Sequence, residues 1–141
     1  MMVLVDTSVW SLALRRKDAD LSSQDRKLVT ALQELIREGR VQVVGPVRQE
    51  LLSGIREPER YRKVRNQLRA FPEPTVEAGD YENAAHMSNQ CRARGISGSP
   101  IDFLICAVAQ HRHWQIFTTD RDFTNYRKAI PVNLYQPLGK L

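Results

Sequence analysis

Four acidic residues stand out because each lies at the start or end of a segment that should be largely buried. They are Asp6 in VLVDTSVW, Glu50 in GPVRQELL, Asp102 in GSPIDFLI and Asp120 in IFTTDRDF. Carboxylates are rarely buried unless they are paired or bind a cation. Converging in a chain whose formal net charge is +5, these acids would indicate a divalent metal ion and phosphate chemistry.

The first two acids also have simpler explanations. Asp6 follows an apolar strand pattern, where ligands of open α/β sheets bind, but Asp6 or Thr7 can equally cap the next helix. Glu50 lies in the middle of a short helix, where a glutamate is ordinarily solvated. What draws attention to Glu50 is its helix, which directly follows the second predicted strand.

The last two acids are similarly ambiguous. Asp102 is the third helical residue after a Ser-Pro start, so it can bond back to the backbone of Ser99. The helix dipole would also keep Asp102 ionised and ready to hold a cation. Asp120 and Asp122 follow a strand, and either can be a helix cap while the other binds metal, or both can bind it. Three hydroxyl residues are expected to orient these carboxylates by hydrogen bonds, namely Thr7, Ser8 and Thr118.

The donor types favour a hard cation. Mg²⁺ and Mn²⁺ prefer oxygen ligands, whereas zinc sites use histidine and cysteine at short, regular spacings. His86 stands alone, and His111 and His113 are two residues apart, so they do not share a helix face. We therefore expect Mg²⁺ or Mn²⁺ and interpret the histidines as surface or boundary residues.

The elements that would position these acids alternate along the chain. Strands are predicted at 2–5, 41–44, 75–76, 115–118 and 132–135. Helices are predicted over 9–14, from Ser22 to Gly39, from Pro46, from Pro58, over 79–94 and from Pro100. Short strands alternating with helices predict a single domain, 1–141, with an α/β sandwich architecture. Its central sheet would be mainly parallel, with about four to five strands.

Composition narrows the class further. Hydrophobic residues make up 42% of the chain, enough for a packed core, and no apolar run approaches the ~20 residues of a membrane span. The start of the sequence has no basic region typical of a secretory signal. Cys91 and Cys106 form no C-x-x-C pair, which favours reduced core cysteines in the cytoplasm, although the sequence alone does not exclude a disulfide.

Four motifs together resemble a known family. VDTSVW at the start, QELL near 50, G-x-S-P-x-D-x-x-I near 100 and T-x-D-x-D-F near 120 are similar to PIN-domain ribonucleases. The resemblance is greatest to VapC-type toxins of bacterial type II toxin–antitoxin modules and spans almost the whole chain. Leu104-Ile105-Cys106 replaces a run of smaller residues found in many members.

The resemblance implies a role for each acid. Asp6, Glu50, Asp102 and Asp120 take the places of the four family acids, and Asp122 matches an additional acid that often follows the fourth. They would hold one or two Mg²⁺ or Mn²⁺ ions, with Glu50 acting directly or through water. The implied activity is endonucleolytic cleavage of structured RNA, often transfer or ribosomal RNA. Members typically form homodimers and are neutralised by a cognate antitoxin protein.

A basic stretch at 56–69 has two interpretations. It carries six arginines and lysines but only two acids, and such a run is usually a solvated helix face. It can also contact RNA phosphates, which adds affinity and salt dependence with little sequence selection. The tentative RNA-binding residues are Arg62, Arg65 and Arg69.

Two other functions compete with the nuclease interpretation. One is a PIN-like module that binds RNA or protein without turnover, against which the complete set of four acids argues. The other is a phosphatase with an aspartyl nucleophile after the first strand. Such enzymes usually have a second aspartate two residues later, where this chain has Ser8.

Overall fold

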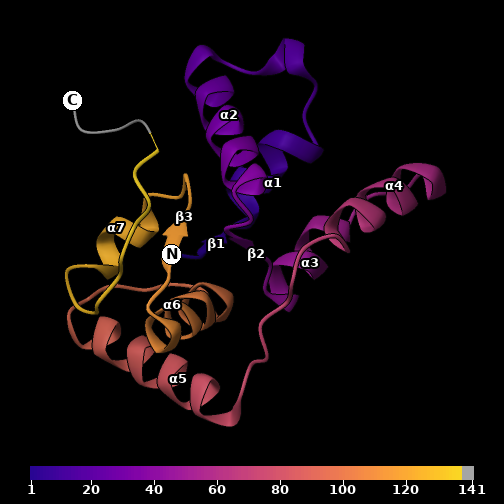
Figure 1. Ribbon diagram of the computed structural model, residues 1–141. Coiled ribbons are helices and arrows are strands. Elements are labelled where there is room, and N and C mark those ends of the chain that lie inside the picture. The colour runs from indigo at the N-terminus through magenta and orange to yellow at the C-terminus, as the bar shows by residue number, and fades with distance from the viewer. Residues whose placement is uncertain (138–141) are drawn as a thin grey trace.

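The computed structural model describes residues 1–137, which form a short parallel sheet between layers of helices (Figure 1). In chain order the elements are β1 (Val3–Val5), α1 (Thr7–Leu14), a 3₁₀ turn (Asp18–Asp20), α2 (Ser23–Arg37), β2 (Val41–Gln42), α3 (Gly45–Leu52), α4 (Pro58–Leu68), α5 (Ala78–Ala93), α6 (Pro100–Arg112), β3 (Gln115–Phe117) and α7 (Asp122–Tyr126).

The sheet has the order β2-β1-β3, and both pairings are parallel. Helices α1 and α2 lie on one side of it and α5 and α6 on the other, while α3 and α4 project to one side as an arm (Figure 1). The predicted α/β sandwich with a parallel central sheet is therefore confirmed. Because all three strands run the same way, their carboxyl ends meet at one edge of the sheet.

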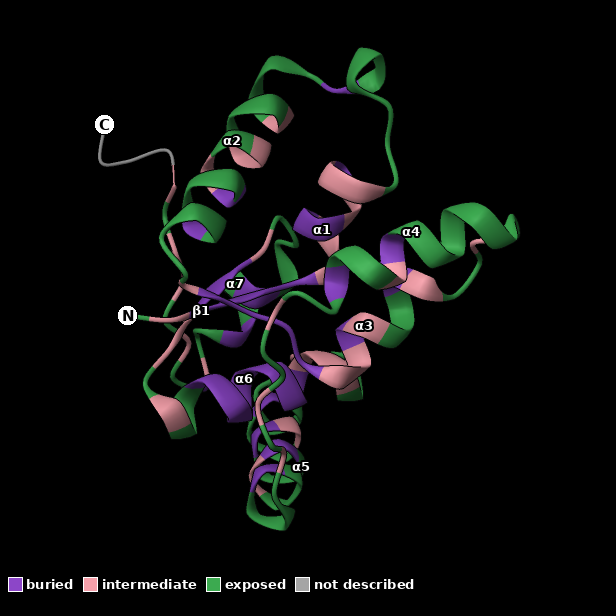
Figure 2. Ribbon diagram, turned by 45° about the vertical axis from the view of Figure 1, so that its right-hand side comes forward, coloured by how far each residue is buried: buried purple, intermediate pink, exposed green. Residues whose placement is uncertain are grey.

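The core is centred on β1, whose three residues are all buried, as is usual for a central parallel strand. The helix faces turned toward the sheet are buried and the outer faces are exposed (Figure 2). Trp10 is 2% exposed and packs against Phe71, with ring centroids 5.1 Å apart. Helix α6 is the most buried helix, with seven consecutive buried residues from Phe103 to Ala109.

The sheet has fewer strands than predicted. The predicted strand at 75–76 is wrong, because that segment has no regular structure. The preceding residues do lie beside β2, since Val43 N–H donates to the Pro72 carbonyl (3.2 Å). Pro72 and Pro74 have no N–H to return, so a ladder cannot form there. The predicted strand at 132–135 is reduced to one parallel bridge between Ile116 and Leu134.

Local helix signals were more reliable than strand signals. Ser22 caps α2 by accepting from Asp25 N–H (3.0 Å), and Ser99 caps α6 by accepting from Asp102 N–H (3.1 Å). After α2 the chain turns at Gly39, whose φ of 69° lies in the left-handed region that favours glycine. Helix α1 begins at Thr7, two residues earlier than predicted, directly after the strand.

The arm formed by α3 and α4 is fastened to α1 by Arg60. Its guanidinium donates to the carbonyls of Leu14 and Arg15, at 3.0 and 3.1 Å, in the last turn of α1. Val64 and Leu68 are the buried residues of α4, whereas Tyr61 on the same helix is 37% exposed.

Both cysteines, Cys91 and Cys106, are buried and unbonded. Of the histidines, His86 and His113 are exposed, and His111 lies at the surface with Nδ1 2.9 Å from Asp80 Oδ1. Within residues 1–137, no helix has the length and hydropathy that a membrane span requires.

Candidate metal centre

The carboxyl edge of the sheet brings the ends of β1 and β3 side by side. Val5 pairs with Phe117, and the next residue, Asp6, donates its N–H to the Phe117 carbonyl (2.9 Å). Asp6 and Thr118 therefore leave the sheet as neighbours, although 112 positions separate them in the sequence. Ligands of open α/β sheets bind just beyond such an edge.

Asp6 is a buried carboxylate held by hydroxyl groups. It is 7% exposed, and its Oδ2 accepts hydrogen bonds from Ser8 Oγ (2.9 Å) and Thr118 Oγ1 (2.8 Å). It stands at the N-cap position of α1, but its side chain makes no capping bond there. Capping therefore does not account for this aspartate, and the hydroxyls fix where its oxygens point.

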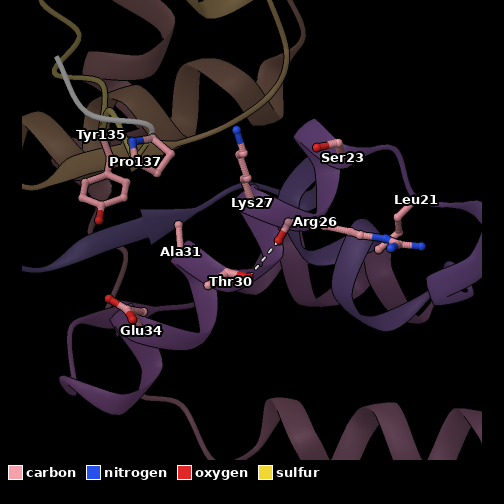
Figure 3. Close-up of a pocket in the computed structure, with 9 residues that line it drawn as sticks. All are labelled: Leu21, Ser23, Arg26, Lys27, Thr30, Ala31, Glu34, Tyr135 and Pro137. Carbon is pink, nitrogen blue, oxygen red and sulfur yellow. Dashed lines mark hydrogen bonds between the residues drawn. The ribbon is translucent and has the colours of Figure 1, made fainter. Parts of the chain in front are cut away.

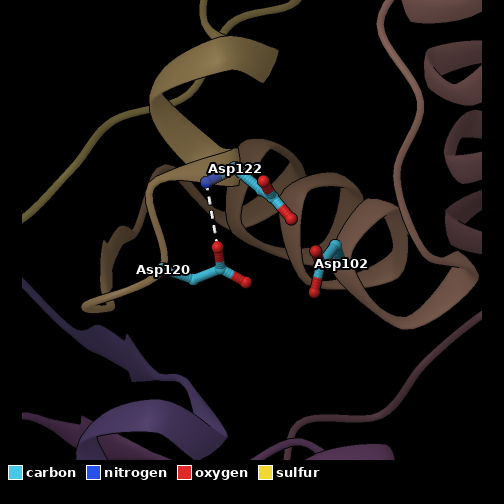
Figure 4. A group of neighbouring side chains, drawn as sticks. All are labelled: Asp102, Asp120 and Asp122. Carbon is cyan, nitrogen blue, oxygen red and sulfur yellow. Dashed lines mark hydrogen bonds between the residues drawn. The ribbon is translucent and has the colours of Figure 1, made fainter.

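Three further aspartates converge beside this edge (Figure 4). Asp102, Asp120 and Asp122 each offer a carboxylate oxygen, and these oxygens lie within 4.8 Å of one another. Asp120 N–H donates to Thr118 Oγ1 (3.0 Å), and Asp122 N–H donates to Asp120 Oδ1 (2.9 Å). Backbone N–H donors thus help to hold together carboxylates whose like charges would otherwise drive them apart.

Asp102 feels this crowding most. Burial raises the pKa of its carboxyl above the usual range, and the neighbouring charges of Asp6 and Asp120 raise it further. The hydroxyl of Tyr126, which donates to Asp102 Oδ2 at 2.7 Å, and Ser99 act in the opposite direction. A bound cation would relieve the same repulsion that now favours the protonated carboxyl.

Glu50 lies beside this group without belonging to it. Its exposed side chain accepts a hydrogen bond from Thr7 Oγ1 at 2.7 Å. Thr7 is the first residue of α1 and comes immediately after Asp6. Its bond to Glu50 therefore links α3 to the start of α1, next to Asp6. Glu50 is therefore close to the carboxylates through Thr7, and its expected part in holding metal or water stays a prediction.

The donor chemistry fits a hard divalent cation. The converging group consists of carboxylate oxygens alone, the ligands that Mg²⁺ and Mn²⁺ prefer. The structure groups Asp122 with Asp102 and Asp120, while Asp6 accepts hydrogen bonds from hydroxyls; the expected roles of these acids as metal ligands stay predictions. Thr7, Ser8 and Thr118 each bond a site carboxylate; their functional roles stay predictions.

Sequence reasoning overlooked Tyr126, the fully buried residue that donates to Asp102. It comes four residues after Asp122, so both lie on one face of α7. That spacing was the only signal available. Nothing local connects Tyr126 with Asp102, which belongs to a different helix.

A large hollow lies elsewhere on the protein. It measures about 800 Å³ and lies between α2 and the segment 135–137 (Figure 3). Its charged lining residues are Arg26, Lys27 and Glu34, and none of the clustered aspartates reaches it. A smaller neighbouring hollow of about 430 Å³ includes Thr118 and Asp120. The carboxylates therefore lie at the open edge of the sheet and not in a deep cavity.

A parallel sheet whose carboxyl edge gathers aspartates defines an α/β protein with a carboxylate centre of the kind that binds divalent cations. Comparison with protein families makes the assignment specific. The model of the PIN domain matches residues 3–129, and the chain belongs to the PIN domain family. No curated protein matches the sequence.

Solved structures share the whole fold at low sequence identity. FitAcB from Neisseria gonorrhoeae is 19% identical, with a TM-score of 0.72 over 97% of this chain and 99% of that one. A toxin–antitoxin complex from Klebsiella pneumoniae is 17% identical, with a TM-score of 0.72 over 96% and 97%. VapBC2 from Rickettsia felis, bound to a promoter DNA fragment, is 14% identical, with a TM-score of 0.74 over 96% and 98%.

Proposed function

We propose that this protein is a metal-dependent endoribonuclease of the VapC type, which cleaves structured RNA in the cytoplasm. The observation that carries the proposal is the convergence of Asp102, Asp120 and Asp122 beside the buried Asp6, in a chain of the PIN family. Titratable side chains that are crowded in this way often mark a functional site. Transfer RNA or ribosomal RNA is the substrate we favour.

Asp102, Asp120 and Asp122 would hold Mg²⁺ or Mn²⁺, with Asp6 and Glu50 adjoining. When bound, the ion would supply positive charge to the phosphoryl oxygens and make a water more acidic. Asp102 is half-buried, whereas Asp120 and Asp122 are exposed, so a phosphodiester can approach from the side of the latter two.

The protein would contribute to this reaction by holding the carboxylates in place and by directing helix dipoles at them. Thr118 and Ser8 hold Asp6, and Thr7 holds Glu50, before any substrate arrives. Prepositioned groups lower the reorganisation that accompanies the transition state. The helices α1 and α6 begin at this edge, so the positive ends of their dipoles face the acids. No serine, histidine or lysine nucleophile is required.

Cleavage of structured RNA with and without metal tests the proposal. The protein should cut transfer or ribosomal RNA in Mg²⁺ or Mn²⁺, and EDTA should stop the reaction. Asp102→Asn should lose at least about 100-fold in rate, because it removes a carboxylate from the centre. Asp20→Asn, in the exposed 3₁₀ turn, serves as the matched control and should retain full activity. Equal rates of cleavage by the two variants would show that Asp102 does not bind a catalytic metal ion.

We propose that α4 contacts the RNA backbone. Two arginines of α4 and the arginine that caps its C-terminal end are spaced at i, i+3 and i+7, and no ion pair to them is found among residues 1–137. Phosphate contacts of this kind strengthen binding to any sequence and weaken with salt. The residues are Arg62, Arg65 and Arg69.

We further propose that the protein is a homodimer neutralised by a cognate antitoxin. One protein of similar fold is described as a toxin–antitoxin complex from Klebsiella pneumoniae, and this likeness supports the proposal of an antitoxin partner. Light scattering should give twice the chain mass of 16.2 kDa. Co-expression with the product of an adjacent small gene should yield a stable complex that no longer cleaves RNA. A monomer, or a complex that stays fully active, would contradict these proposals.

The alternative is a PIN-like module that binds RNA or protein without turnover. Binding of RNA with no cleavage at any Mg²⁺ or Mn²⁺ concentration would favour that alternative. Cleavage that depends on Asp102 would exclude it.

A further inference from the structure

A tyrosine outside the group of acids is fixed against the most crowded of them. Tyr126 OH donates to Asp102 Oδ2 at 2.7 Å, joining the end of α7 to the first turn of α6. We propose that Tyr126 is a positioning residue that sets the orientation of Asp102 toward a divalent cation, and that Gly98 exists to admit the tyrosine ring. This inference rests on the proposed metal-dependent function.

The hydroxyl of Tyr126 has little freedom to move. The side chain is 0% exposed, and its ring packs against Phe103 and Phe123, with centroids 4.9 and 5.3 Å away. Phe103 follows Asp102 directly, and Phe123 follows Asp122. One ring therefore contacts the neighbours of two site acids, and a shift of either helix start would move it.

Gly98 makes room for this arrangement. A Cβ built at position 98 would lie 2.5 Å from Tyr126 OH, 2.6 Å from Cε1 and 2.7 Å from Cζ. Real Cβ atoms essentially never approach so closely, so any side chain there would displace the ring. The backbone at Gly98 does not have the positive φ that only glycine favours. The need for glycine at this position therefore comes from the tyrosine and not from the turn.

The hydrogen bond from Tyr126 fixes the orientation of the Asp102 carboxylate. Ser99 Oγ accepts from the Asp102 N–H and caps the helix, while Tyr126 holds Oδ2. Among residues 1–137, the tyrosine hydroxyl donates to Oδ2 of this carboxylate, and a side-chain hydrogen bond with Ser99 also lowers the pKa of Asp102. The tyrosine hydroxyl therefore fixes the rotamer in which Asp102 presents its carboxylate, and both oxygens keep lone pairs with which they could bind a cation. Removing a group that orients a metal ligand in this way typically lowers the affinity for the metal by about 10- to 100-fold.

Calorimetric titration of metal-free protein with Mn²⁺ tests the inference. Tyr126→Phe keeps the ring and its packing but removes the donor, so its Kd for Mn²⁺ should rise by about 10- to 100-fold. The number of sites per chain should stay that of the wild type. A tyrosine with a merely structural role would lower the melting temperature or the competent fraction and leave Kd unchanged. Tyr81→Phe, on the exposed surface of α5, controls for the loss of a hydroxyl.

A glycine pair gives an independent route to the same answer. Gly98→Ala should weaken Mn²⁺ binding by displacing the ring, whereas Gly79→Ala, where an added Cβ meets nothing within 4 Å, should bind like the wild type. The double variant of Gly98→Ala and Tyr126→Phe should lose less than the product of the two single losses, because both act on one bond.

The outcomes separate this inference from the function on which it rests. Wild-type protein that binds no Mn²⁺ and cuts no RNA would overturn the proposed function, and this inference with it. A wild type that binds Mn²⁺ and cleaves RNA, with Tyr126→Phe matching it in Kd, would overturn the inference alone.

Discussion

Removing the hydroxyl of Thr118 is the sharpest test of how the site is held. Thr118 Oγ1 donates to Asp6 Oδ2 at 2.8 Å and accepts from the N–H of Asp120 at 3.0 Å. Thr118→Val keeps the shape of the side chain and removes both bonds, together with the longer contact of the hydroxyl with Ser8 Oγ (3.3 Å). Asp6 is buried, whereas Asp120 is exposed and can turn its N–H to water. Most of the cost should therefore come from the bond to Asp6.

The loss of unfolding free energy in Thr118→Val depends on the charge of Asp6 and on its remaining hydrogen bonds. A hydrogen bond to a charged group contributes about 1.5–3 kcal/mol net. Ser8 continues to donate to the same oxygen of Asp6 (2.9 Å), so the penalty should fall near the lower end, at about 2 kcal/mol. For a domain of this size, that loss lowers the melting temperature by roughly 4–10 °C. Loosening Asp6 and Asp120 should also weaken Mn²⁺ binding about 10-fold.

Thermal unfolding of metal-free protein and Mn²⁺ calorimetry give the two readings. Thr118→Ser keeps the hydroxyl and should stay near the wild type in Mn²⁺ affinity. Thr30→Val removes an exposed hydroxyl that bonds only the Arg26 carbonyl of its own helix, and should change stability by less than about 0.5 kcal/mol. A Thr118→Val variant that melts and binds like the wild type would show that this hydroxyl does not hold the site. A Thr118→Ser variant that loses as much affinity as Thr118→Val would show that the methyl group, and not the hydroxyl, is the cause.

Three further predictions concern charge. Without metal, Asp102→Asn should raise the melting temperature by about 2–5 °C, since it relieves repulsion among the acids; an unchanged or lower value in EDTA would argue against that repulsion. Asp80 is 3% exposed, and although burial raises its pKa, the Glu77 N–H, His111 and Arg112 together lower that pKa below the usual value. Asp80→Asn should therefore cost about 2 kcal/mol at pH 7 by denaturant unfolding. Neutralising Arg62, Arg65 and Arg69 should reduce the salt dependence of RNA binding, measured by filter binding, by up to about three charges. An unchanged dependence of affinity on salt would mean that α4 is a solvated helix face without RNA contacts.

The pH dependence at Asp80 has a definite sign. Because the folded-state pKa is lowered, the stabilisation is complete above the unfolded value of about 3.9 and is lost as pH falls through the lower folded value. The difference in unfolding free energy between wild type and Asp80→Asn should therefore shrink in acid. A difference that stays constant from pH 7 to pH 2 would mean that the charge of Asp80 contributes nothing.

The sequence predicted those features that depend on short-range patterns. Ser22 and Ser99 cap helices as their spacing indicated, and Asp6 and Asp120 follow strands whose apolar runs were plain. Because parallel strands end at one edge, the meeting of these acids followed from topology alone. The local patterns were sufficient there, since each element carries its own signal.

Other features required contacts between distant segments. The predicted strand at 75–76 had suitable side chains. Pro72 and Pro74 just before it have no backbone N–H groups, however, and these are needed for a hydrogen-bonded ladder with β2. The bond from Tyr126 to Asp102 spans 24 residues and joins two helices, so no periodicity reports it. The contact of Asp80 with His111 spans 31 residues for the same reason, and His111 had been interpreted only as a surface or boundary residue.

The central claim is that these carboxylates hold a divalent cation, and anomalous diffraction from crystals containing Mn²⁺ tests it most directly. We expect an anomalous peak about 2.1 Å from carboxylate oxygens of Asp102, Asp120 and Asp122. The same peak should be lost or greatly weakened in crystals of Asp102→Asn. Wild-type crystals with no peak at the carboxyl edge of the sheet, or a peak unaffected by Asp102→Asn, would contradict the account.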